Sequence, residues 1–165
     1  MDLTTLTDEL TSFHATFQEK AKAALKETFT KFFADFPEVA HLQWTQYTPY
    51  FNDGDACVFG VGEIAMYLTK EGRAQFGLEV RDDDKDEDEE DDTDGEGDVY
   101  SLYTWAREGG RTYISPRAQS LCETVTTISK GLNGIESFLE AIYGDHVEVT
   151  LHRDGTSTVD GYEHD

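Results

Sequence analysis

The residues most able to do chemistry crowd into one short run of carboxylates at residues 82–92. The acidic members of this run are Asp82, Asp83, Asp84, Asp86, Glu87, Asp88, Glu89, Glu90, Asp91 and Asp92. Carboxylate oxygens ligate calcium, so an EF-hand loop is the first motif to test. The register that places Gly95 at the invariant glycine puts Glu90 first and Ser101 twelfth, where an Asp and a bidentate Glu are needed. The spacing therefore predicts no dedicated calcium site.

Histidines and nucleophiles form no recognisable motif. His146 and His152 share one face of a predicted strand, but about 20 Å separates them at the rise of an extended chain. His41 would join residues 163–165 as ligands only if distant segments met. The sequence has no Gly-x-Ser-x-Gly motif and no Gly-rich phosphate loop. We therefore predict a non-enzymatic protein without metal or cofactor, and keep a metal-dependent hydrolase as an alternative.

Aromatic residues and acids meet in the stretch WTQYTPYFNDGD at residues 44–55. Rigid aromatic side chains beside carboxylates suit a protein contact. The same residues would also close the corner of a hairpin core, and both interpretations stay open. The contact hypothesis names Trp44, Tyr47, Tyr50, Asp53 and Asp55.

The charge of the chain limits its partners. Thirteen Lys and Arg stand against 35 Asp and Glu, which gives a net charge of -22. Thirteen acids and one lysine, a net charge of -12, lie between Asp82 and Asp98. Such a chain repels nucleic acid and anionic membranes and attracts basic surfaces. We predict a basic protein surface as the partner, with no direct binding of nucleic acid and no membrane.

The two cysteines and the first residues indicate a compartment. Cys57 and Cys122 fall in a predicted core strand and a predicted core helix, where reduced thiols pack as small hydrophobes. The opening MDLTTLTDEL has no basic start and no apolar stretch, which argues against a signal peptide. No run of about twenty apolar residues follows. These features predict a cytoplasmic protein.

The N-terminal region has the apolar period of a helix, from about Thr5 to Asp35. Such a helix measures on the order of 45 Å and would overhang a compact body. Apolar residues in its first half recur in alternating steps of three and four, the spacing that packs against another helix. Two interpretations stay open: the residues at 3–17 pack on the protein's own sheet, or they form a homo-oligomer or partner contact.

The rest of the chain alternates between strand and helix patterns. A strand is predicted after Val39, followed by a long return strand at 56–68 that bends near Gly60 and Gly62. Further strands are predicted at 75–81 and on both sides of Gly109–Gly110. The chain ends in a predicted hairpin that turns at Asp154–Gly155. Helices are predicted from Ser115 and Pro116, and from an Asn133 cap to Gly144 with Phe138 facing inward.

These elements predict a single α+β domain over residues 1–165. It would hold a long N-terminal helix, an antiparallel sheet of about six strands, a broken helical layer and a C-terminal β-hairpin. The acidic run joins one predicted strand to another, so residues 82–98 are interpreted as a loop insertion and not as a domain boundary.

Three stretches carry a resemblance to known proteins: WTQYTPYFNDGD at 44–55, YGDHVEVT at 143–150 and YEHD at 162–165. They resemble a group of small acidic proteins of bacteriophages and bacteria. The acidic run is not part of the resemblance. The resemblance implies an accessory or host-interaction role, with a location in the host cytoplasm, and it implies no activity and no functional residues.

Charge and resemblance together predict a binding protein that engages a basic protein surface. A phage-encoded inhibitor would do so by replacing the phosphates of nucleic acid as the charge partner of a host protein. The alternative is a structural or assembly subunit that associates through the long N-terminal helix. In that case the acidic run serves only solubility.

Overall fold

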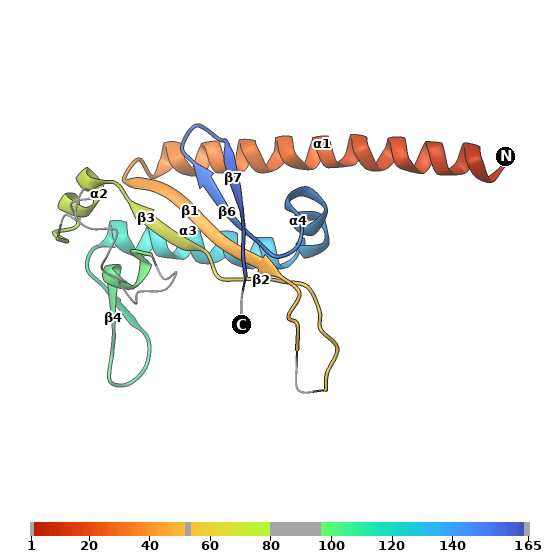
Figure 1. Cartoon of the computed structure of the whole chain (residues 1–165). Coiled ribbons are helices and arrows are strands. Elements are labelled where there is room, and N and C mark those ends of the chain that lie inside the picture. The colour runs from red at the N-terminus through yellow and green to blue at the C-terminus, as the bar shows by residue number, and fades with distance from the viewer. Residues whose placement is uncertain (1, 52–53, 80–96, 164–165) are drawn as a thin grey trace.

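The computed structural model describes residues 2–51, 54–79 and 97–163 (Figure 1). In chain order its elements are α1 (Leu3–Asp35), β1 (Val39–Tyr47), β2 (Gly60–Val61), β3 (Ala65–Leu68), α2 (Lys70–Gln75), a 3-10 helix (Val99–Leu102), β4 (Tyr103–Trp105), β5 (Arg111–Tyr113), α3 (Pro116–Asn133), α4 (Glu136–Tyr143), β6 (Val147–His152) and β7 (Ser157–Gly161). The predicted α+β class, the long N-terminal helix and the C-terminal hairpin are confirmed.

Helix α1 ends where the sequence predicts but begins two residues earlier. The side chain of Asp2 is the N-cap, and it accepts a hydrogen bond from the backbone nitrogen of Thr5 at 2.8 Å. A cap at Thr5, which the capping-box spacing of Thr5 and Asp8 would predict, does not form, because the Asp2 carboxylate already accepts the hydrogen bond from the Thr5 amide. At the other end Pro37 follows Phe36, which closes the helix.

All strand pairs are antiparallel, and β1 is at the centre of the larger sheet. The order is β2-β1-β6-β7, and β3 also pairs with β1. Leu42, Trp44 and Gln46 point to the buried face of β1, whereas Gln43 and Thr45 on the other face are half-buried. The buried face packs against α1, α3 and α4 in a single core. The hairpin β4-β5 is a separate small sheet.

The return strand is interrupted at the predicted glycines. Gly62 donates a backbone hydrogen bond to the carbonyl of Thr45 at 2.8 Å. A Cβ atom on Gly62 would lie 3.2 Å from the Thr45 carbonyl oxygen and 2.9 Å from the Thr45 Oγ1 atom, so the glycine allows the backbone of β1 to approach closely. Cys57, predicted in a core strand, lies instead in an exposed segment before β2. The pairing with β1 begins only at Gly60, which leaves that thiol outside the sheet.

The strand predicted at 75–81 is wrong over its described part. Thr69 caps the short helix α2, and Gly77 then turns the chain with φ of 70°. Phe76 and Leu78 still pack against the core, but from a turn. Alternation over so short a stretch is overridden here by the Thr69 cap and the Gly77 turn. Residues 80–81 lie outside the described residues.

The helical layer matches the prediction at one cap and departs from it at the other. Ser115 caps α3 and Pro116 occupies its first turn, as predicted. Asn133 does not cap α4, because α3 continues through it and Ile135 precedes α4 without a side-chain cap. Gly144, with φ of 97°, ends α4 as expected. The inward orientation predicted for Phe138 is wrong, because its side chain is 41% exposed.

The predicted insertion ends before residue 97. Asp98 is buried, accepts a hydrogen bond from the Leu68 backbone nitrogen at 2.8 Å and pairs with Arg73. A Cβ atom on Gly97 would come within 2.6 Å of the Met66 carbonyl oxygen. Gly97 and Asp98 therefore belong to the folded body and not to a loop insertion. The rest of the acidic run lies outside the described residues.

Candidate interaction surfaces

The first half of α1 carries an exposed apolar stripe. Its members are Leu3 (79% exposed), Leu6 (41%), Leu10 (59%), Phe13 (71%) and Phe17 (37%). They follow one another in steps of three, four, three and four residues, so they lie along one side of the helix. Figure 1 shows this half of α1 extending well beyond the sheet and the other helices. Of the two interpretations, packing of the stripe on the protein's own sheet is therefore wrong, and a homo-oligomer or partner contact stays open.

An apolar groove of about 240 Å³ continues the stripe at the point where α1 reaches the body. Phe17 and Ala21 contribute from α1, and Phe138 and Ile142 from α4. The rings of Phe17 and Phe138 have their centroids 4.9 Å apart. Gln18 fixes the two helices, because its Nε2 atom donates to the backbone carbonyl of Ala141 at 2.7 Å. Stripe and groove thus share Phe17 and form one continuous apolar surface.

Charge is divided unevenly along α1. Asp2, Asp8 and Glu9 are the charged side chains before residue 19, and no lysine or arginine precedes Lys20. The following turns are mainly basic, with Lys20, Lys22, Lys26 and Lys31 against Glu19 and Glu27. Lys22 lies 3.8 Å from a carboxylate oxygen of Glu19, and both side chains are at least half exposed. The helix therefore offers an acidic end and a basic middle to a partner.

The predicted aromatic contact is only partly a surface. Trp44 is 2% exposed and lies in the core, so it is removed from the contact hypothesis. Tyr47 is half-buried and lies 5.4 Å from Tyr162, centroid to centroid. Tyr50 is 70% exposed and stacks on His146 with centroids 4.6 Å apart. The tyrosines thus meet C-terminal residues, which spacing alone did not predict.

Asp145 fixes the backbone beside these tyrosines. Its carboxylate accepts hydrogen bonds from the backbone nitrogen and the hydroxyl of Thr48, both at 2.8 Å. It also accepts from the backbone nitrogen of His146 at 2.8 Å. Burial by itself would raise the pKa of Asp145, but these hydrogen bonds lower the pKa overall. Asp55 is exposed, and Asp53 lies outside the described residues.

The predicted acidic contact residues all lie outside the described residues. They are Asp82, Asp83, Asp84, Asp86, Glu87, Asp88, Glu89, Glu90, Asp91 and Asp92. Their joint role as a partner-binding element remains a prediction from sequence.

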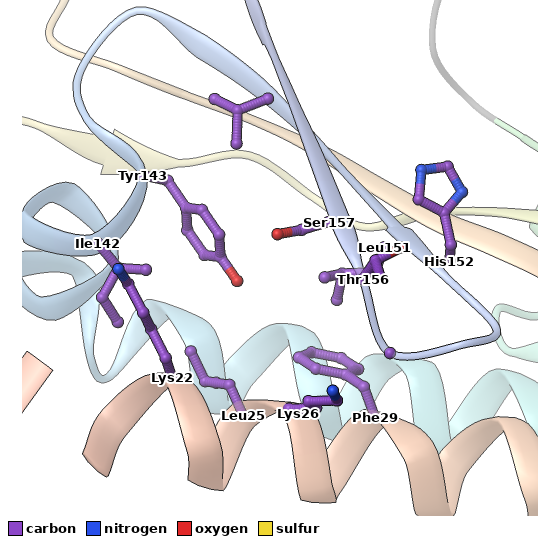
Figure 2. Close-up of a pocket in the computed structure, with 12 residues that line it drawn as sticks. Lys22, Leu25, Lys26, Phe29, Ile142, Tyr143, Leu151, His152, Thr156 and Ser157 are labelled. Atoms are coloured by element: carbon purple, nitrogen blue, oxygen red, sulfur yellow. The ribbon is translucent and has the colours of Figure 1, made fainter. Parts of the chain in front are cut away.

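A second cavity, of about 350 Å³, lies between α1, the end of α4 and the hairpin β6-β7 (Figure 2). Lys22 and Lys26 reach it from α1, and Tyr143 faces Ser157 across it. Burial raises the pKa of the Tyr143 hydroxyl, and a hydrogen bond with Ser157 acts in the opposite direction. The arrangement suits a small acidic group above an apolar floor, but its cations are surface lysines on flexible stems.

The histidines that the structure describes do not gather into a metal site. His41 stacks on Tyr67 with centroids 4.4 Å apart, and His152 shares a hydrogen bond with Thr158 at 2.7 Å. Within residues 2–51, 54–79 and 97–163, no group of three or more His, Cys, Asp or Glu side chains is placed to hold a metal ion. The same part of the chain has no helix with the length and apolar character needed to cross a membrane.

Comparisons of the chain with protein-family models, with curated proteins and with solved structures found no match. Sequence reasoning named the stripe but missed the groove. The sequence feature that marks the groove is the placement of small residues beside large ones on α4. Ser137 and Ala141 stand next to Phe138 and Ile142 and leave room between the helices.

Proposed function

We propose that the protein is a non-enzymatic assembly protein that self-associates through the stripe of α1. The observation that carries the proposal is the exposure of five large apolar side chains, at coiled-coil spacing, on a helix that overhangs the body. Apolar residues at this spacing serve helix pairing, and within the described residues no other helix packs against the first turns of α1.

The energy of burial supports the same conclusion. Complete burial of a Leu or Phe side chain contributes about 1.5 to 3 kcal/mol. Weighted by their exposed fractions, the five stripe residues of one copy represent about 4 to 9 kcal/mol of burial that the isolated chain does not gain. Association of two copies costs about 4 to 15 kcal/mol in lost freedom of movement. Two stripes buried together contribute about 9 to 17 kcal/mol, which matches or exceeds most of that range of cost.

The molar mass in solution tests this proposal. Size exclusion with light scattering, run at high salt, should give a defined oligomer for the wild type. Phe13→Asp should be a monomer, because the new carboxylate cannot be buried in the interface without a partner charge. Ser12→Asp is the matched control, since it adds the same charge to an exposed position off the stripe and should leave the mass unchanged. A wild type that stays monomeric at all concentrations, or a Phe13→Asp protein that keeps the oligomer mass, would reject the proposal.

A second candidate function is the binding of a basic protein surface, as an inhibitor of a nucleic-acid-binding protein. The concentration of a net charge of -12 between Asp82 and Asp98 supports it. Replacement of the ten acids at 82–92 by Asn and Gln should abolish the capture of basic proteins from a cell lysate, and a DNA duplex should compete with wild-type capture. Capture that survives neutralisation would exclude this role for the run.

A further inference from the structure

We infer that the partner on the stripe is a second copy of this chain in antiparallel orientation, with its first helical turn in the groove between α1 and α4. The inference rests on the proposed function and specifies its partner and geometry. The interface is then the same surface used twice around a two-fold axis, as in most homodimers.

The spacing of the stripe fixes a register for the antiparallel pair. Four apolar layers form when Leu10 lies opposite Phe13 and Leu6 lies opposite Phe17 of the second copy. The two-fold axis then passes between residues 11 and 12. In this register Leu3 of the second copy lies opposite Lys20 and next to Ala21, which lines the groove. Leu3 is the most exposed member of the stripe, and the groove supplies the apolar surface that it lacks.

The charges along α1 favour this orientation and register. A parallel pair would place the acids of both N-terminal halves side by side, whereas the antiparallel pair places Asp2 of the second copy beside Lys20 and Lys22. Glu9 lies next to Thr16 of the second copy in this register. The neighbouring register, with Leu6 opposite Leu10, would bring the two Glu9 carboxylates together.

The placement of the two folded bodies, meaning the sheet and helices α2 to α4 of each copy, also favours the antiparallel orientation. Each chain carries a net charge of -22, most of it on the body and the acidic run. A parallel pair would hold the two bodies at the same end of the helices, where they repel each other. An antiparallel pair holds them at opposite ends, because the body is attached to the C-terminal half of α1 (Figure 1).

Disulfide cross-linking separates the two orientations. In a Cys57→Ser background, Leu6→Cys and Phe17→Cys proteins are prepared separately and oxidised alone and as a mixture. A disulfide requires Cα atoms within about 7 Å, and residues 6 and 17 are about 16 Å apart along one helix. The antiparallel pair therefore predicts a covalent dimer in the mixture and none in either protein alone. Covalent dimers of each protein alone would show a parallel pair and overturn the inference.

A substitution outside α1 tests the groove. Ala141 lines the groove from α4 and is exposed, so Ala141→Asp should fold normally but weaken the dimer by about tenfold or more, because its charge would face Leu3 and Leu6 of the second copy. Thr127→Asp, at an exposed position of α3, is the matched control and should leave the dissociation constant unchanged. Circular dichroism checks the fold of both variants.

The outcomes distinguish the inference from the proposal on which it rests. Loss of the oligomer in Phe13→Asp combined with unchanged affinity in Ala141→Asp, or with self-linking of Leu6→Cys, would reject the antiparallel geometry and keep self-association. A wild type that stays monomeric would reject both.

Discussion

The indole nitrogen of Trp44 donates a hydrogen bond to the Oε1 atom of Gln46, two residues along the same strand, at 3.1 Å. The amide nitrogen of Gln46 donates in turn to the carbonyls of Leu139, at 3.1 Å, and Gly144, at 2.6 Å. Gln46 is fully buried, so one amide group connects the central strand to α4 and to the residue that ends it. This connection sets the position of α4, which forms one wall of the groove.

Gln46→Leu should therefore destabilise the protein by about 2 to 4 kcal/mol, because it removes the acceptor of the buried Trp44 indole and the donor to the carbonyls of Leu139 and Gly144. Urea denaturation followed by tryptophan fluorescence measures the change. Gln119→Leu, at an exposed position of α3, is the control and should change stability by less than about 0.5 kcal/mol. Equal midpoints for the two variants would contradict the role assigned to the buried amide.

Two deletions that differ by two residues test the end of the acidic run. A Gly/Ser linker in place of residues 82–96 should keep or raise the melting temperature, because that segment has no apolar residue and much like charge. The same linker in place of 82–98 should lower the melting temperature, because it leaves Arg73, mostly buried, without Asp98. Calorimetry measures the melting temperatures of both proteins. Equal melting temperatures would show that Asp98 is dispensable for stability.

The two thiols should differ sharply in reactivity. Cys57 is exposed, whereas Cys122 is 1% exposed and burial raises the pKa of its thiol to about 11. A chromogenic disulfide reagent at neutral pH should therefore label one thiol per native chain quickly and the second only after unfolding. Rapid labelling of both thiols, or of neither, in the native protein would contradict these placements.

His41 should make stability depend on pH. Burial lowers the pKa of His41 below its ordinary value of 6.5, the neighbouring His152 lowers it further, and Asp98 only partly opposes them. The unfolded chain then binds a proton more readily than the folded chain, so this contribution to stability is present above pH 6.5 and is lost as the pH falls below it.

His41→Gln should reduce the loss of stability between about pH 7.5 and pH 5, measured as the change in urea midpoint. Gln119→Leu, at an exposed position of α3 and without a titrating group, should leave the pH dependence as in the wild type. A His41→Gln protein with the same pH dependence as the wild type would show that His41 titrates alike in both states.

Elements with long or well-marked local patterns were predictable from the sequence. Helix α1 has an apolar period over more than thirty residues. Helix α3 starts with the pair Ser115 and Pro116: the serine side chain accepts a hydrogen bond from a free backbone amide of the first turn, and the proline ring fixes a helical φ angle. The turn at Asp154–Gly155 was equally clear, because Gly155 takes φ of 79° there.

The errors arise where non-local packing overrides a short pattern. Residues 75–79 alternate like a strand, yet Thr69 caps a helix that runs into them and Gly77 then turns the chain with φ of 70°. The pairing of β1 with β6 joins residues about a hundred positions apart, which no local pattern encodes. The groove depends on that pairing, since Gln46 of β1 positions α4.

The overhang of α1 also acts as an electrostatic spacer. In the antiparallel pair each body begins near Phe17, which lies opposite Leu6 of the other copy, so about 16 Å of helix separates the two bodies. The Debye length at physiological ionic strength is about 8 Å, so the separation spans roughly two screening lengths. Two chains that each carry a net charge of -22 can thus bring their uncharged stripes together, because salt screens the repulsion between the two bodies. Dimerisation should consequently weaken at low ionic strength, in the opposite sense to the binding of a basic partner.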